Sequence, residues 1–219
     1  RHRRPPFSRV ALTITLSLMA SGAIGSDNAS TEDLGNLALE DLMKIEVSTA
    51  SRKQQKMADV AAAVYVISQE DIRRSGATSI PEALRMAPGL NVARIGSSSW
   101  AIGARGFNGR YANKLLVLMD GRTVYTPMFS GVFWNGQDTL MEDIERIEVI
   151  RGPGAAMWGA NAVNGVINII TKSAHDTRGN LAIAGAGSLE RGFAALRHGG
   201  QIDEDTDYRV YGKAFDRGA

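Results

Sequence analysis

The sequence predicts an α+β domain followed by the beginning of an antiparallel β-meander. Two short helical patterns, each preceded by a serine at the N-cap position, and several apolar strand patterns predict the domain. The meander is predicted by three strand-like pieces near the end of the chain, which are separated by short polar turns. A strand, two helices and then several strands within roughly 115 residues are typical of a compact α+β domain.

The first 25 residues have the pattern of a signal peptide. The basic stretch RHRRPPFSR precedes a short apolar run, residues 10–20, and the small residues SGAIGS follow it. We expect cleavage after Ala23 or Gly25. The run is shorter than the about 20 apolar residues that a membrane-spanning helix needs. A buried core helix is the alternative, but the arginine-rich flank favours export from the cytoplasm.

Most of the positive charge of the chain lies in this predicted signal peptide. The formal net charge of the whole sequence is +2, and the first 25 residues contain no acid. Their basic residues are Arg1, Arg3, Arg4 and Arg9. Removing them changes +2 to −2, so nucleic-acid binding loses its main support and we expect no nucleic-acid partner.

Composition also argues against several kinds of chemistry. The sequence has no cysteine, which excludes disulfides and thiolate ligands within it. His2, His175 and His198 lie far apart and lack metal-binding spacing. We therefore expect no metal site and no cofactor.

Residues 26–56 are expected to form a mobile arm. They are mostly polar, with small and acidic residues and no sustained period. Ile45 and Val47 alternate with Glu46 and Ser48, which predicts a short extended segment followed by a basic, glutamine-rich linker. Nothing nearby in the sequence is expected to pair with this segment.

The ordered domain is expected to begin with an apolar strand, residues 60–68, followed by a first helix. Ser68 stands three residues before Asp71, which is the spacing of an N-cap with an acid in the first turn. Gly76 is expected to end the helix.

Ser79 and Glu82 repeat this spacing at a second helix, which Pro88 and Gly89 should end. We expect both helices to bury one apolar stripe. The residues of that stripe are Ile72, Ile80, Leu84 and Met86.

Strand patterns follow the helices. Residues 89–96 and 98–106 are short extended pieces, and residues 115–126 contain the hairpin signal Asp120-Gly121 between two β-prone runs. Residues 125–138 form an aromatic segment that resembles a loop.

A brief helical turn and two further strands should complete the domain. In residues 139–152 the turn leads into a strand with Ile147 and Val149 on one face. Residues 165–172, GVINIITK, predict the second strand. The glycines between them are spaced as in a phosphate-binding loop, but Ala160 and Asn161 stand where its lysine and hydroxyl would be. We therefore read these glycines as backbone corners.

The last third of the chain predicts antiparallel strands at residues 180–187, 191–202 and 207–215. Tyr208 and Val210 share one face of the last piece. Three strands cannot close a barrel, and single-chain transmembrane barrels begin at about eight. The pattern fits the start of an outer-membrane barrel, and a soluble β-sandwich fits it equally well.

Four motifs in order resemble the plug domain of TonB-dependent outer-membrane receptors. They are VYVISQEDIRRSGATSIPEALRMAPGLNV, AIGARGFNGR, LLVLMDGRTVY and IERIEVIRGPGAAMWGANAVNGVINIITK. The resemblance covers residues 57–172, and the strands from residue 173 to residue 219 resemble the first strands of the receptor barrel.

This resemblance implies a plug of a small mixed β-sheet with short helices, followed by the first antiparallel strands of a 22-stranded transmembrane β-barrel. It implies import of a scarce ligand such as an iron–siderophore complex, another metal chelate or cobalamin across the outer membrane. It also implies contact with outer-membrane lipid and energy from TonB with its partners ExbB and ExbD. The chain is then a fragment of a longer protein.

The resemblance also implies three groups of site residues. Ile45, Glu46, Val47, Ser48, Thr49 and Ala50 resemble the TonB box, although Glu46 and Ser48 depart from the common pattern. Arg105 and Arg151 match arginines that face acidic residues on the barrel wall. The apical loops that help bind ligand are matched by Ser99, Trp100, Tyr125, Met128, Phe129, Phe133 and Trp134.

A secreted or periplasmic soluble protein, either a binding module or an enzyme, is the alternative. Asp120 with Asp138 would be one candidate acid/base pair. Another would use Asp143 with Glu142 and Glu145. No nucleophile or metal motif accompanies these carboxylates. We expect Asp143, Glu145 and Glu148 to be ordinary charges at a helix end and on a strand surface, and the protein not to be an enzyme.

Overall fold

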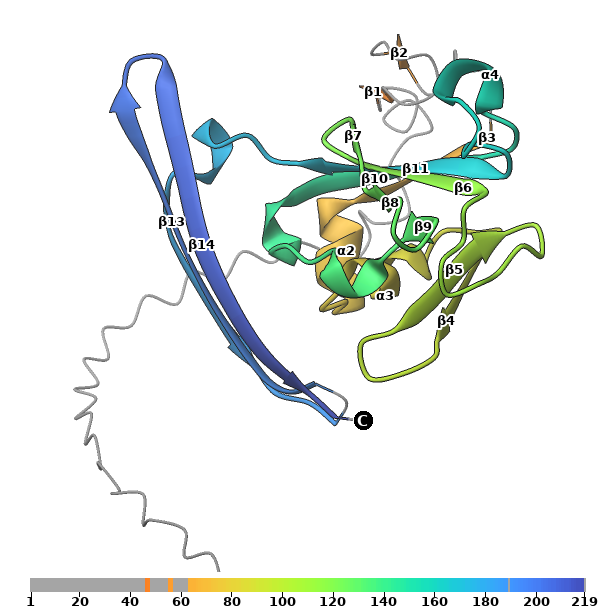
Figure 1. Ribbon diagram of the computed structural model, residues 1–219. Coiled ribbons are helices and arrows are strands. Elements are labelled where there is room, and N and C mark those ends of the chain that lie inside the picture. Colours follow the sequence, from red (N-terminus) through yellow and green to blue (C-terminus); the bar gives the residue numbers. More distant parts are fainter. Residues whose placement is uncertain (1–45, 48–54, 57–62, 189, 219) are drawn as a thin grey trace, which may run out of the picture. The chain divides into compact units, whose positions relative to one another are not determined.

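The computed structural model describes residues 46–47, 55–56, 63–188 and 190–218 (Figure 1). These ranges include both predicted helices and all three strands of the predicted meander. The predicted signal peptide and most of the predicted arm lie outside them.

A five-stranded mixed sheet forms the centre of the domain. Its strands, in spatial order, are β3 (Ala63–Ser68), β10 (Ile144–Arg151), β11 (Gly165–Thr171), β6 (Leu115–Met119) and β7 (Arg122–Thr123). The pair β11–β6 is parallel and the other pairs are antiparallel. Asp120 and Gly121, which join β6 to β7, both have positive φ as a type I′ turn requires. The predicted hairpin and mixed sheet are confirmed.

The first predicted helix is present as α2 (Gln69–Ser75). The Ser68 hydroxyl accepts a hydrogen bond from the Asp71 backbone N–H, and the Asp71 carboxylate accepts one from the Ser68 backbone N–H. This reciprocal pair satisfies two N–H groups at the helix start. Gly76 ends the helix in the left-handed conformation, with φ of 67°.

The second helix is shorter than predicted. α3 spans Ile80–Leu84, and turns with hydrogen bonds from Met86 and Ala87 continue it toward Pro88. Ser79 occupies the N-cap position, but its side chain makes no capping hydrogen bond. The Glu82 carboxylate instead accepts hydrogen bonds from the backbone and hydroxyl of Thr78. Ile72, Ile80 and Leu84 are buried as expected, whereas Met86 is only half-buried.

Shorter elements connect the main ones. Two small antiparallel sheets are formed by β4 (Leu90–Arg94) with β5 (Trp100–Ala104), and by β8 (Tyr125–Thr126) with β9 (Gly131–Val132). The predicted helical turn before β10 is the 3₁₀ turn η3 (Met141–Asp143), and η2 (Trp134–Gly136) follows β9. The helix α4 (Ala155–Trp158) lies between β10 and β11.

Both faces of the five-stranded sheet are covered. α2 and α3 lie on one side of it, as Figure 1 shows, and this side holds the larger apolar cluster, which includes Ile147 and Ile167. A smaller cluster on the other face includes Val64, Ile150 and Val166. Burial on both sides explains why β11, GVINIIT, is mostly apolar. In β10, IERIEVIR, the buried acid Glu148 is paired with Arg146.

The glycine-rich segment between β10 and β11 turns the chain within the domain. The backbone of Gly165 lies so close to the carbonyl oxygen of Ile150 that a β-carbon there would be 2.4 Å from it. Gly152 adopts φ of 133° at the end of β10. The prediction that these glycines serve as corners is therefore confirmed.

A three-stranded antiparallel sheet follows the short turn η4 (His175–Thr177). Its strands are β12 (Gly179–Gly185), β13 (Glu190–Asp203) and β14 (Thr206–Arg217), in the order of the chain. The predicted meander is confirmed, and β13 and β14 are longer than expected.

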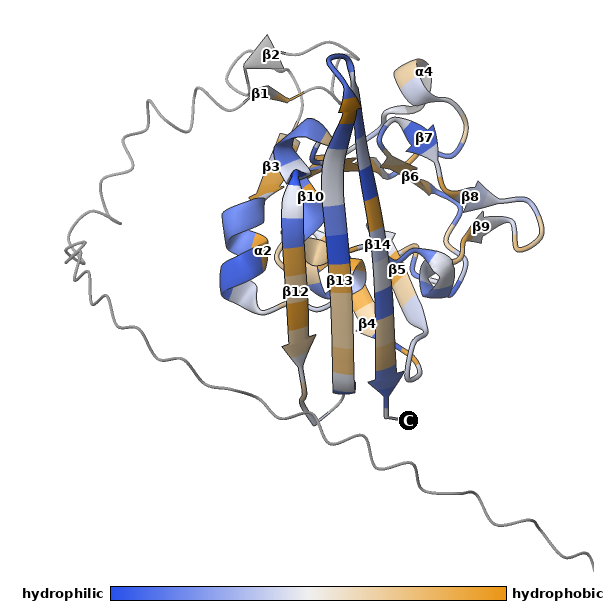
Figure 2. Ribbon diagram, turned by 90° about the vertical axis from the view of Figure 1, so that its left-hand side faces the viewer, coloured by the Kyte–Doolittle hydropathy of each residue, from blue (hydrophilic) through white to orange (hydrophobic). Residues whose placement is uncertain are grey.

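The two faces of this sheet differ in chemistry. The register places four cations on one face, which we call the basic face: Arg197, Arg209, Lys213 and Arg217. The opposite face, the apolar face, is lined by Ala182, Ala184, Ala194, Leu196, Val210 and Ala214. Figure 2 shows the apolar stretches along these strands. Leu196 is 67% exposed, so the apolar face has no cover among the described residues.

The predicted extended segment near residue 46 is paired, contrary to expectation. β1 (Glu46–Val47) forms an antiparallel pair with β2 (Gln55–Lys56), which belongs to the segment predicted to be a linker. Val47 is 0% exposed and packs in the smaller apolar cluster. Because this cluster offers apolar neighbours from distant strands, sequence proximity alone did not reveal the contact.

Candidate functional site

Two of the six predicted TonB-box residues, Glu46 and Val47, lie in the described part of the chain. The side chain of Val47 packs with Val64, Leu116 and Val166, which belong to three strands of the central sheet. In the part of the segment that the structure describes, β1 pairs with β2 and the Val47 side chain is buried. Ile45 and Ser48–Ala50 lie outside the described residues.

The two predicted contact arginines lie close to one glycine corner. A β-carbon on Gly152 would be 3.6 Å from Nη2 of Arg105, and one on Gly89 would be 3.3 Å from Cδ of Arg151. Both arginines are exposed. Within the described residues neither forms an ion pair, so both guanidinium groups have donors available for an acidic partner.

An aromatic cluster forms where two loops of the domain meet. The ring of Phe129 stacks on Tyr111 at a centroid distance of 4.8 Å with an interplanar angle of 8°, and Phe133 lies 5.2 Å from Phe129. The guanidinium of Arg110 lies 5.4 Å from the Tyr111 ring. Tyr111 was not predicted as a site residue. Its only sequence signal is an aromatic residue beside an arginine in a loop rich in glycine and asparagine.

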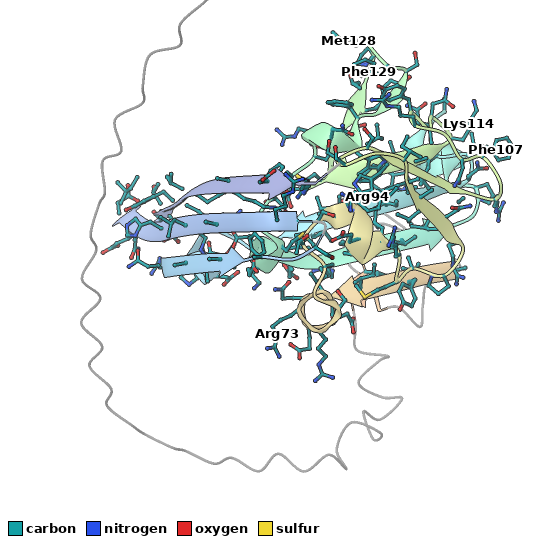
Figure 3. All side chains as sticks on the ribbon, turned by 90° about the horizontal axis from the view of Figure 1, so that it is seen from below. Arg73, Arg94, Phe107, Lys114, Met128 and Phe129 are labelled. Carbon is teal, nitrogen blue, oxygen red and sulfur yellow. The ribbon has the colours of Figure 1, made fainter. Side chains whose placement is uncertain are left out.

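Side chains near this cluster extend away from the core. Met128 is 82% exposed, and Phe107 on a neighbouring loop is also exposed (Figure 3). Tyr125 is half-buried at the start of β8. The loop before β5 joins the same region, because the side-chain amide of Asn135 donates to the hydroxyls of Ser98 and Ser99.

The two predicted site tryptophans are core residues. Trp100 and Trp134 are buried and belong to the larger apolar cluster. Arg85 and Arg94 lie 5.3 and 5.8 Å from the Trp100 ring. These two residues are therefore corrected from ligand contacts to packing residues, because aromatic loop residues look alike in sequence whether they point inward or outward.

The loops are strongly basic. Residues 94–137 contain five cations and one acid, so their formal charge is 5 − 1 = +4. The one acid, Asp120, is engaged locally: its carboxylate accepts hydrogen bonds from the Thr171 backbone and hydroxyl. This surface therefore combines exposed aromatic rings with uncompensated positive charge.

Two of the carboxylates considered for an enzyme form ion pairs with basic side chains instead. Lys213 Nζ lies 2.8 Å from Asp138 Oδ1, and Arg197 hydrogen-bonds Asp143. Asp143 is 1% exposed and Glu148 is 0% exposed. The expectation that these two are ordinary surface charges is wrong, because each is buried beside an arginine: Arg197 for Asp143 and Arg146 for Glu148.

Across the described residues there is no group of three or more acidic or histidine side chains able to hold a metal ion. Nor is any helix in that part of the chain long and apolar enough to cross a membrane.

Comparison with known proteins identifies the family. The family model described as "TonB-dependent Receptor Plug Domain" matches residues 56–166. The chain belongs to the TonB-dependent receptor family. This confirms the resemblance seen in the sequence and the α+β plug.

Curated relatives of this receptor sequence are transporters and receptors. It is 38% identical over 156 residues to the vitamin B12 transporter BtuB of Vibrio vulnificus (strain CMCP6), an alignment covering 69% of this chain and 25% of the relative. It is 32% identical over 231 residues to the ferric enterobactin receptor of Pseudomonas aeruginosa, covering 95% of this chain and 29% of the relative. The chain thus spans about a quarter of the length of these relatives.

Solved structures agree with the fold. The ferripyoverdine receptor of the outer membrane of Pseudomonas aeruginosa superposes with a TM-score of 0.61 at 20% sequence identity, covering 79% of this chain and 22% of that one. At this identity the likeness shows the fold alone. The named relatives are transporters and receptors, which agrees with the outer-membrane location predicted from the sequence.

Proposed function

We propose that this chain is the plug and the first barrel strands of a transporter that imports a scarce ligand in a TonB-dependent manner. The observation that carries the proposal is the joining of a plug-family domain to a meander with one apolar and one basic face. A strand whose faces alternate in this way suits a barrel wall, with lipid on one side and the plug on the other.

The domain assignment follows from this proposal. Residues 1–25 are the signal peptide, 26–56 the periplasmic arm, 57–172 the plug and 173–219 the start of a 22-stranded barrel. The remaining strands lie in the longer protein. Arg105 and Arg151, with donors available beside one corner, bind acidic residues on the barrel wall.

The arm couples the plug to energy in the inner membrane. Ile45–Ala50 is the TonB box, and TonB binds it by adding a strand to its own sheet edge. Among the described residues, the contact that holds β1 consists of one two-residue pairing and one buried valine. Ligand binding outside loosens this contact, and TonB, driven by ExbB and ExbD, then pulls the arm to remodel the plug.

The ligand surface is formed by Ser99, Tyr125, Met128, Phe129 and Phe133, with Tyr111 added. Both ligand classes named for the relatives, a ferric siderophore and cobalamin, are candidates. Without Arg105, which is assigned to the barrel wall, residues 94–137 still have a formal charge of 4 − 1 = +3. This charge and the stacked rings favour an anionic, aromatic metal chelate.

The TonB box is tested by replacing Val47 or Ile45 with proline. Proline has no backbone N–H, so it prevents strand pairing with TonB. We expect energised uptake of radiolabelled ferric enterobactin or cyanocobalamin to be abolished while binding of the same ligand to cells is unchanged. Val47→Ala keeps the N–H and is the matched control. Normal uptake by Val47→Pro would contradict the box assignment.

Fractionation of the full-length protein distinguishes the transporter from the alternative, a secreted or periplasmic soluble binding module. The proposal expects a heat-modifiable protein that needs detergent and sediments with the outer membrane. Recovery in the soluble periplasmic fraction would support the alternative.

A further inference from the structure

A buried ionic cluster joins the plug to the first barrel strands. Asp143, the last residue of η3, has a carboxylate that faces two guanidinium groups. Its Oδ1 accepts a hydrogen bond from Arg197 on β13, and its Oδ2 lies 3.6 Å from Nε of Arg209 on β14. The register places these arginines diagonally on the basic face, because Arg197 pairs with Tyr211 and Arg209 with Gly199.

The backbone around Lys172 closes this cluster. The Lys172 N–H donates to the carbonyl of Asp143 at 2.8 Å, and Nη1 of Arg209 donates to the carbonyl of Lys172 at 3.0 Å. Lys172 follows β11 directly, and Asp143 precedes β10 directly. One cluster therefore holds the start of β10, the end of β11 and two barrel strands together.

A second charged contact lies on the same face. Lys213 Nζ lies 2.8 Å from Asp138 Oδ1, and both side chains are largely shielded from solvent. The plug thus presents acids to the first barrel strands, which is the reverse of the polarity expected at Arg105 and Arg151.

The N-terminal part of the plug meets these strands differently. Between α2 and the three-stranded sheet lies a mostly apolar cavity of about 210 Å³. Ile72 and Leu140 line it from the plug, and Ile183, Phe193 and Ala195 line it from the sheet. The open space means that α2 and this sheet are incompletely packed against each other here.

The order of strands determines whether a pull on the arm first reaches the cavity beside α2 or the ionic cluster at Asp143. Among the described strands, β3 lies at the edge of the sheet and pairs with β10 alone, while β10 lies between β3 and β11. Force applied from the N-terminal side reaches β3 before β10. Because β10 begins directly after Asp143, the ionic cluster lies where detachment would spread from β3 and α2 into β10.

We propose that Asp143, Arg197 and Arg209 form an anchor that keeps β10 and β11 seated on the barrel wall during transport. Remodelling by TonB then stops at β3 and α2, and the passage opens at the cavity beside α2. This inference rests on the proposed function, since it requires that TonB pulls on the arm.

Thiol labelling of the full-length receptor in energised cells tests the anchor. Ile67→Cys on β3 and Ile169→Cys on β11 each place one thiol at a buried position. Cells with and without TonB are given ferric enterobactin and cyanocobalamin together, and labelling by a maleimide is measured. We expect TonB-dependent labelling of Ile67→Cys, and no TonB-dependent labelling of Ile169→Cys.

Removing the anchor should extend the labelled region. In receptors that also carry Asp143→Asn or Arg197→Gln, labelling of Ile169→Cys should rise about tenfold or more, because labelling follows the free energy of local opening. This rise should occur only in cells that contain TonB. Arg191→Gln is the matched control: this arginine is on the same strand but pairs weakly with Asp216 at 4.0 Å in an exposed position. It should leave labelling unchanged.

The outcomes separate this inference from the proposed function. TonB-dependent labelling of both thiols in the otherwise unchanged receptor would overturn the anchor alone. So would equal labelling of Ile169→Cys in Asp143→Asn with and without TonB, since the cluster would then only support the resting fold. Absence of TonB-dependent labelling at both positions would overturn the proposed function as well. Should Asp143→Asn not assemble, Arg209→Gln, which removes the more distant guanidinium at 3.6 Å, should give a smaller TonB-dependent rise at Ile169→Cys, and no rise would count against the anchor.

Discussion

In the five-stranded sheet both faces of β10 and β11 are covered by protein, whereas in the three-stranded sheet one face meets the plug and the other is bare. The covered sheet carries Ile147 and Ile167 on one side and Ile150 and Val166 on the other. The other sheet alternates cations with apolar residues along β13 and β14. β-strands in the two sheets are therefore buried in different ways, and the exposed apolar face is the one that meets lipid in the proposed barrel wall.

The largest expected effect is a loss of stability when a buried side chain of the five-stranded sheet is removed, compared with a side chain on the bare face of the three-stranded sheet. Ile147→Ala removes a buried side chain from the five-stranded sheet and should lower the free energy of unfolding by about 2–5 kcal/mol. Leu196→Ala, on the bare face, should cost less than about 1 kcal/mol because few neighbours are lost. Protease resistance of the detergent-solubilised receptor in increasing urea measures both. Equal losses would mean that the apolar face is packed against protein.

A charge on the apolar face tests which solvent it meets. Leu196→Arg should destabilise the inserted receptor by about 2–4 kcal/mol if the residue lies near the bilayer midplane. Ile202→Arg, close to the turn between β13 and β14, should cost only about 0–1 kcal/mol. The yield of heat-modifiable receptor in the outer membrane reports both. If Leu196→Arg were neutral, the face would be exposed to water and the soluble alternative would gain support.

Replacing an exposed aromatic residue of the plug loops should weaken ligand binding, whereas replacing a buried one should lower stability. Phe129→Ala removes a stacked, partly exposed ring and should weaken ligand binding by about 0.5–1.5 kcal/mol without changing stability. Trp134→Ala should instead lower stability, since Trp134 lies in the core. Binding of labelled ferric enterobactin or cyanocobalamin to cells, together with thermal unfolding, gives both readouts. A stability loss in Phe129→Ala would place this ring among the packing residues.

The smallest expected effect concerns an exposed ion pair on α2. Hydrogen bonds from Arg73 and then Arg74 lower the pKa of Glu70 from 4.5 to about 2. Because the folded-state pKa is depressed, the stabilisation is fully present above pH 4.5 and is lost as the pH falls toward 2. Solvent screens this pair, so the effect is slight.

Thermal unfolding of the receptor and of Glu70→Gln across pH 2–7 measures this contribution. The difference between the two proteins should be constant above about pH 5 and shrink below it. A difference that grows on acidification would contradict the assigned direction.

Local signals predicted many elements correctly. The Ser68–Asp71 spacing, the Asp120-Gly121 turn and the alternation after residue 179 each depend on a few neighbouring residues, and each appears in the structure. Motifs of the plug, read in order, also identified the family before the fold was known.

Predictions that required distant partners were less successful. Val47 has no neighbour in sequence that explains its burial, since its contacts come from β3, β6 and β11. Trp100 and Trp134 resemble exposed loop aromatics until the core is assembled around them. Asp143 looked like a helix-end charge because Arg197 and Arg209 are more than fifty residues away.

The sequence by itself determined the order of helices and strands, the glycine corners and the plug family, because capping, turn chemistry and periodicity act within a few residues. Only the tertiary structure decided which aromatic rings remain exposed, where Val47 packs and which acids meet the barrel strands. Burial and charge pairing depend on residues brought together from distant parts of the chain, and a linear pattern does not contain those distances.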